Sequence, residues 1–232
     1  MRVHTYPSKT DTARAIVRRL LALIDVADKP YFHLALSGGT TPAHMFDVWA
    51  DEFAAQTPWK RLRLYWVDER CVPPTDAESN YGMTKKHLLD KVAMPSEQVF
   101  RIYGEADAQA EAVRYARMVA QSGMPMQDGF PVFDAILLGA GDDGHTSSIF
   151  PDRMELLQSP HSYVVAVHPT SGQKRIALTG EPIVRSPHVL FLMTGEGKRP
   201  VLHDMQGSAD TGPAAYVVHH AKHEVEVFTD LG

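Results

Sequence analysis

The sequence predicts an α/β protein in which helices flank a doubly wound, mostly parallel central sheet. Segments with helical apolar spacing alternate along the chain with short apolar runs typical of buried strands, which is the pattern of βα units. Glycine-rich or charged segments follow directly after several of these runs. The length of 232 residues fits one large α/β domain over residues 1–232 better than two domains.

Helices are expected where apolar residues recur every three or four positions. Residues 10–26 show this spacing, with Ile16 and Leu20 on the apolar face. Thr41 followed by Pro42 predicts a helix start, with threonine as N-cap and proline at the first helical position, and a helix that runs to about residue 55. Further helices are expected over residues 79–90, 107–121 and 196–206.

Strands are expected where short apolar runs are bounded by turn residues. These runs cover residues 31–36, 62–67, 133–138, 163–168, 175–179, 189–194 and 224–228. In an open parallel sheet, ligands bind just outside the carboxyl ends of the strands. The segments that follow the strands are therefore the first places to look for a functional site.

Composition narrows the possible partners and compartments. The net charge is −5 and no run of Lys or Arg is present, which argues against nucleic acid as a partner. No apolar segment reaches about 18 residues, and the first eight residues do not resemble a signal peptide, so we expect no membrane association. The single cysteine, Cys71, cannot form an internal disulfide and fits a reducing cytoplasm.

The segment Ser37-Gly-Gly-Thr-Thr-Pro42 links an expected strand to an expected helix. Its glycines allow a ligand close to the backbone, and its hydroxyls and the N–H groups at the helix start suit an anion. It is neither a Walker loop nor a dinucleotide fingerprint. A purely structural turn and a degraded nucleophile elbow with Ser37 as nucleophile remain open at this point.

The segment Gly139-Ala-Gly-Asp-Asp-Gly-His145 follows the expected strand 133–138. Asp142 and Asp143 are near enough in sequence to set the tautomer of His145 and raise its basicity, which suits proton transfer. A simple Asp-Gly turn is the alternative. Calcium binding is disfavoured because the spacing of an EF-hand loop is missing.

Charged side chains also follow other expected strands. Asp68-Glu-Arg70 comes directly after the strand 62–67, while Arg175 and Lys198 lie near later strand ends. The Asp68-Glu-Arg70 group is either a solvated edge or part of a site, whereas Arg175 and Lys198 alone would each most often be a solvated surface charge. Together with the Ser37 segment they provide the local positive charge that a phosphate requires.

Taken in order, these segments resemble the 6-phosphogluconolactonase family, within the wider glucosamine-6-phosphate isomerase/deaminase superfamily. SGGTTP resembles that family's SGGSTP, and WVDERCVPPTDAESNYG resembles its DER…SNYG block. FDAILLGAGDDGHTSSIFP resembles its DGHTASLFP signature, and FLMTGEGK its late G-x-x-K element. The resemblance runs nearly end to end.

The resemblance implies a Rossmann-like fold with no obligatory cofactor or metal and a phosphosugar lactone as the small-molecule partner. The implied reaction is hydrolysis of 6-phospho-D-glucono-1,5-lactone in the oxidative pentose phosphate pathway. It further implies that His145 is the general acid/base and that Asp143 orients its imidazole. Arg70 is expected to stabilise the oxyanion, and Asp68 to orient Arg70 or contact the sugar hydroxyls. The implied phosphate site comprises Ser37, Gly38, Gly39, Thr40, Thr41, Arg175 and Lys198. The oligomeric state is expected to be a monomer or weak homodimer.

Two residue-level features bear on the choice between branches of this superfamily. The deaminase branch typically has Asp-Glu-Tyr where this chain has Asp68-Glu-Arg70, and the arginine favours the lactonase. After Arg175, the lactonase pattern usually continues to an asparagine–alanine pair, which is absent here. A glucosamine-6-phosphate deaminase and a non-catalytic sugar-phosphate-binding module remain the alternatives.

Overall fold

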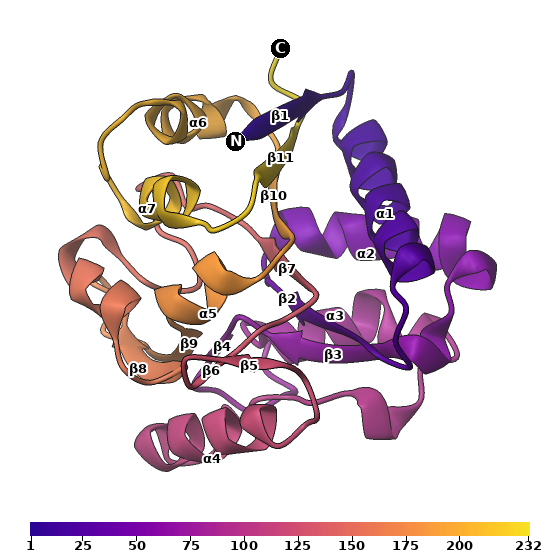
Figure 1. Cartoon of the computed structure of the whole chain (residues 1–232), viewed down its shortest axis with the longest axis horizontal. Coiled ribbons are helices and arrows are strands. Elements are labelled where there is room, and N and C mark those ends of the chain that lie inside the picture. Colours follow the sequence, from indigo (N-terminus) through magenta and orange to yellow (C-terminus); the bar gives the residue numbers. More distant parts are fainter.

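Six parallel strands form the central sheet of the computed structural model, which describes all 232 residues (Figure 1). Their order across the sheet is β1-β11-β10-β7-β2-β3. The strands are β1 (Arg2–Thr5), β2 (Phe32–Leu36), β3 (Leu62–Trp66), β7 (Ala135–Leu138), β10 (Val189–Met193) and β11 (Val225–Thr229). The expected single α/β domain with a mostly parallel sheet is confirmed.

Helices cover both faces of this sheet and account for the apolar character of its strands. The helices are α1 (Lys9–Val26), α2 (Thr40–Phe53), α3 (Asn80–His87), α4 (Ala108–Ala120), α5 (Gly180–Arg185), α6 (Arg199–Gln206) and α7 (Pro213–His220). Helices α1 and α2 pack on one face, and α4, α6 and α7 pack on the other (Figure 1). Along β10, Leu190 and Leu192 pack into the core on the side of α1 and α2, while Phe191 and Met193 pack into the core on the opposite side. Both faces of the strand are therefore buried.

Two of the expected strands do not join the parallel sheet. β8 (Tyr163–Val167) and β9 (Lys174–Leu178) pair antiparallel with each other, and β9 also pairs antiparallel with the short β4 (Asp68–Arg70). The Asp68–Arg70 segment is thus a strand of a second sheet, where a loop was expected. Antiparallel pairing aligns Arg70 with Arg175 across the two strands. A small hairpin of β5 (Met126–Gln127) and β6 (Phe130–Pro131) completes the strands.

The start of α2 differs from the sequence prediction. The N-cap is Gly39 rather than Thr41, and no side chain caps the helix. Gly39 has φ of 107°, a conformation that favours glycine and that lets the chain leave β2 and enter the helix two residues earlier than expected. The first-turn N–H groups therefore remain free of side-chain caps at the end of β2.

Other helix boundaries follow local capping more closely. Ser79 caps α3 by accepting from the Gly82 N–H, and Asp107 caps α4 by accepting from the Ala110 N–H. The expected helix 196–206 begins with a short 3₁₀ turn at Glu196–Lys198. The strand β1 and helices α5 and α7 were not anticipated. None of the helices has the length and apolar character needed to cross a bilayer.

Candidate active site

A cavity of about 240 Å³ opens at the carboxyl edge of the central sheet. Because β10, β7, β2 and β3 are neighbours and parallel, the segments that follow them converge there. The second sheet contributes β4 and β9 to the same cavity. The sequence-predicted residues that line it are Ser37, Gly38, Gly39, Thr40, Thr41, Asp68, Arg70, His145, Arg175 and Lys198.

His145 and Asp143 form a hydrogen-bonded pair at the rim of this cavity. The Nδ1 atom of His145 lies 2.6 Å from Asp143 Oδ1, and the same oxygen accepts the His145 backbone N–H at 3.1 Å. Partial burial raises the pKa of Asp143, but the hydrogen bonds and charge of His145 outweigh it and lower this pKa overall. Asp143 is therefore ionised at neutral pH. An ionised acceptor keeps the proton on Nδ1 and leaves Nε2 free to accept another.

Gly141 makes room for this pair. A β-carbon at position 141 would overlap the His145 imidazole and lie 2.6 Å from Asp143 Oδ1. The turn is closed by hydrogen bonds from the Gly141 N–H to the His145 carbonyl and from the Gly144 N–H to the Gly141 carbonyl. The absence of a side chain at Gly141 thus permits the close packing of the histidine on its own turn.

Asp142 does not contact His145, although both Asp142 and Asp143 lie close enough in sequence to do so. Instead it accepts a hydrogen bond from Lys198 Nζ at 2.6 Å. Asp142 is 78% exposed and Lys198 is 24% exposed, so the pair lies at the mouth of the cavity. A bound anion would compete with a well-solvated carboxylate for this ammonium group.

Two arginines lie side by side on one face of the second sheet. Arg70 and Arg175 are cross-strand partners, so their side chains leave the sheet on the same side. Burial lowers the pKa of Arg175, and the neighbouring Arg70 charge lowers it further. The Nε atoms of both arginines are buried without a hydrogen-bond partner. Two adjacent, incompletely paired guanidinium groups are suited to an anionic or polarised oxygen ligand.

Asp68 is nearly fully buried and is held by serine rather than by Arg70. Its Oδ2 atom accepts a hydrogen bond from Ser148 Oγ at 2.6 Å, and Ser148 Oγ in turn accepts from Arg175 at 3.2 Å. Arg70 instead donates to the Glu78 carbonyl at 2.6 Å. The structure shows no hydrogen bond between Asp68 and Arg70, and the Asp68 carboxylate is bound by Ser148 instead.

The Ser37–Thr41 segment packs against the start of α3. A β-carbon on Gly38 would overlap the side chain of Asn80, whose Nδ2 donates to the Asp68 carbonyl at 2.9 Å. Ser37 Oγ forms no hydrogen bond with His145, so no Ser–His nucleophilic pair is present. The glycines therefore bring backbone N–H groups close to Asn80 and to the cavity.

Sequence reasoning missed three residues whose polar side chains line the cavity, Asn80, Ser147 and Ser148. Ser147 and Ser148 both have positive φ, 51° and 57°, which is uncommon for residues other than glycine. The Ser147 hydroxyl donates a bifurcated hydrogen bond to the carbonyls of Val67 and Leu178, which stabilises the Ser147–Ser148 backbone. Only the quoted SNYG and DGHTSS motifs offered a signal for them.

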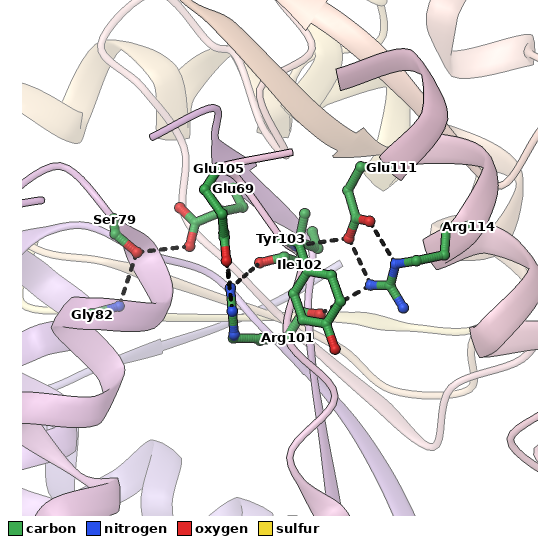
Figure 2. Close-up of polar contacts among 9 residues, drawn as sticks. All are labelled: Glu69, Ser79, Gly82, Arg101, Ile102, Tyr103, Glu105, Glu111 and Arg114. Atoms are coloured by element: carbon green, nitrogen blue, oxygen red, sulfur yellow. Dashed lines mark hydrogen bonds and ion pairs between the residues drawn. The ribbon is translucent and has the colours of Figure 1, made fainter. Parts of the chain in front are cut away.

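A larger cavity of about 370 Å³ is lined in part by Tyr81 and Lys85 of α3. Its cations are already neutralised by neighbouring carboxylates, as Figure 2 shows for the pairs Arg101–Glu105 and Arg114–Glu111. It contains no histidine. The smaller cavity is therefore the candidate active site.

Comparison with known proteins is consistent with this geometry. The family model of glucosamine-6-phosphate isomerases/6-phosphogluconolactonase matches residues 7–227. The chain is 43% identical over 213 residues to a 6-phosphogluconolactonase of Treponema pallidum, covering 91% of this chain and 86% of that protein.

Solved structures share the fold over almost the whole chain. The 6-phosphogluconolactonase from Trypanosoma cruzi superposes with a TM-score of 0.87 at 28% identity, covering 98% of this chain and 93% of that one. A monomeric glucosamine-6-phosphate deaminase has a TM-score of 0.80 at 19% identity, with 98% and 97% covered, a likeness of fold alone. The chain belongs to the glucosamine-6-phosphate isomerase/6-phosphogluconolactonase family of enzymes.

Proposed function

We propose that this protein hydrolyses 6-phospho-D-glucono-1,5-lactone to 6-phospho-D-gluconate, the lactone-opening step of the oxidative pentose phosphate pathway. The observation that carries the proposal is that His145, hydrogen-bonded to Asp143, lines the same cavity as Arg70, Arg175 and Lys198. The relatives named above as 6-phosphogluconolactonases support the choice of substrate.

His145 acts as the general acid/base. Its free Nε2 removes a proton from a water molecule as the water oxygen bonds to C1 of the lactone. The bond between C1 and the ring oxygen then breaks, and the same nitrogen returns the proton to the departing ring oxygen. Asp143 stabilises the imidazolium that exists between these two steps. A positioned general acid/base contributes about 10²–10⁴-fold to the rate.

The phosphate at the far end of the sugar is the anchor. Ser37, the backbone of Gly38 to Thr41 and the cations Lys198 and Arg175 surround the space it would occupy. The start of α2 adds N–H groups that no side chain caps. Fixing the phosphate orients C1 toward His145, so binding energy distant from the reacting bond contributes to the rate.

Arg70 stabilises the negative charge that develops on the C1 oxygen. The Arg70 guanidinium has a partner at the Glu78 carbonyl but a buried, unpartnered Nε. A cation held in place before the reaction stabilises an oxyanion without reorganisation. Asp68, fixed by Ser148, contacts the sugar hydroxyls.

The test is a hydrolysis assay with freshly prepared lactone, corrected for spontaneous opening, on the wild type and on His145→Ala. We expect His145→Ala to lower kcat by about 10²–10⁴-fold with little change in KM. Ammonia release from glucosamine 6-phosphate is measured in parallel. Deaminase activity without lactonase activity would replace the proposed function with the alternative branch. Tight phosphosugar binding without either activity would indicate a binding module.

A further inference from the structure

Glu69 is a buried carboxylate that the mechanism above does not use. Only 2% of Glu69 is exposed, and it lies on β4 between two residues that line the cavity, Asp68 and Arg70. Its side chain points away from the cavity toward the start of α3, where Figure 2 shows it beside Ser79. A carboxylate buried to this degree requires compensating donors.

Four donors surround the two carboxylate oxygens. Oε1 accepts the backbone N–H groups of Arg70 at 2.8 Å and Asn80 at 2.7 Å. Oε2 accepts the Tyr81 N–H at 2.8 Å and the Ser79 hydroxyl at 3.0 Å. Burial raises the pKa of Glu69 overall, although these hydrogen bonds act in the opposite direction. The three backbone N–H groups can only donate, so they favour the ionised carboxylate.

These contacts join two cavity-lining segments that are ten residues apart in sequence. Through its backbone, Arg70 is tied to the first turn of α3, and through its guanidinium it is tied to the Glu78 carbonyl. Asn80 is held by Glu69 at its N–H and reaches Asp68 with its side chain, where it packs against Gly38. Glu69 thus joins the backbone that carries Arg70 to the backbone that carries Asn80.

We propose that Glu69 is a positioning residue for lactone hydrolysis, which holds Arg70 at the developing oxyanion by fastening β4 to the start of α3. This inference rests on the proposed function for its kinetic consequence. The structural part of the inference does not depend on the proposed function: it states that the Glu69 carboxylate orders the segment from Ser79 to Tyr81.

Glu69→Gln tests the proposal because it preserves volume but replaces one accepting oxygen with an N–H₂ group that faces donors. We expect kcat to fall at least tenfold, while KM and inhibition by inorganic phosphate change less than threefold, because Lys198 and the Ser37–Thr41 segment remain in place. Glu69→Asp retains a carboxylate and is expected to recover part of kcat.

Glu111→Gln is the matched control. Glu111 is also 2% exposed and also accepts a backbone N–H, that of Tyr103, but it lies on α4 beside Arg114 (Figure 2), and neither Tyr103 nor Arg114 lines the active-site cavity. Its loss is expected to lower the melting temperature with kcat unchanged. An equal loss of kcat in both variants, or an unchanged kcat in Glu69→Gln of a lactonase-active protein, would overturn the positioning role.

Amide hydrogen exchange separates this inference from the proposed function. The Asn80 and Tyr81 amides are expected to exchange at least tenfold faster in Glu69→Gln than in the wild type, and at the wild-type rate in Glu111→Gln. A wild type without lactonase activity would refute the proposed function. The exchange rates of the Asn80 and Tyr81 amides would then still test whether Glu69 orders the start of α3. Unchanged exchange rates at both amides in Glu69→Gln would refute the claim that Glu69 holds β4 to the start of α3.

Discussion

A methyl group at position 141 is expected to disable the protein while leaving its fold intact. In Gly141→Ala the new β-carbon would lie 2.6 Å from Asp143 Oδ1 and nearer still to the His145 imidazole. Ordinary contacts with a β-carbon begin near 3.4 Å, so the imidazole must retreat by about 1 Å. Gly141 does not have a positive φ, so alanine is compatible with the backbone there, and the cost of the substitution falls on the His145 and Asp143 side chains that must move.

The expected fall in kcat of Gly141→Ala follows from this displacement of the imidazole. A misplacement of about 1 Å costs on the order of 10²-fold in rate, and loss of the general base costs about 10²–10⁴-fold. We therefore expect kcat for lactone hydrolysis to fall about 100-fold or more. KM should change less than threefold because no phosphate-binding residue touches the new methyl group.

Gly197→Ala is the control for this variant. Its β-carbon would meet only Asp142 Oδ1, at an ordinary 4.0 Å, so kcat should remain near that of the wild type. Both variants are compared in the lactone assay and by thermal melting. A Gly141→Ala protein with wild-type kcat would show that the placement of His145 does not limit the reaction, and the mechanism would have to be abandoned.

Three further changes probe the charges of the protein. Lys198→Ala removes a charge-assisted contact worth roughly 1.5–3 kcal/mol, so KM should rise about tenfold or more while kcat changes less; an unchanged KM would place the phosphate elsewhere. Asp142→Asn frees Lys198 from an exposed ion pair worth about 0.2–1 kcal/mol and should lower KM by up to about fivefold, whereas a raised KM would contradict competition for this cation. Burial lowers the pKa of His33 to about 4, so the unfolded chain binds the additional proton as pH falls below about 6.5. The wild type should therefore lose up to about 2 kcal/mol of unfolding free energy between pH 6.5 and pH 5, and His33→Gln should lose less in denaturant titrations at both pH values; equal losses would exclude His33 as the source.

The parallel sheet was predictable because its strands are buried on both faces. Continuous apolar runs such as residues 189–194 have few other stable placements, and the helices between them carry local caps such as Ser79 and Asp107. The convergence of the Ser37 and His145 segments followed from the same rule, since the carboxyl ends of parallel strands share one edge.

Contacts between distant segments were not predictable from local pattern. The three-residue strand β4 is charged throughout and has no strand-like signal, and its pairing with β9 alone places Arg70 opposite Arg175. Likewise, nothing local distinguishes Asp142, which pairs with Lys198, from Asp143, which holds His145. Register and side-chain direction arise from packing between parts of the chain that are far apart in sequence.

The sequence by itself determined the α/β class, the helices and strands of the main sheet, and the segments that supply an imidazole, glycines and cations to one edge of it. Only the tertiary structure decided that Asp142 pairs with Lys198, how two arginines come to share one face, and that Glu69 joins the arginine-bearing strand to a helix. Local periodicity is encoded within a few residues, whereas hydrogen-bond partners across about 10 to 100 residues exist only once the core has formed.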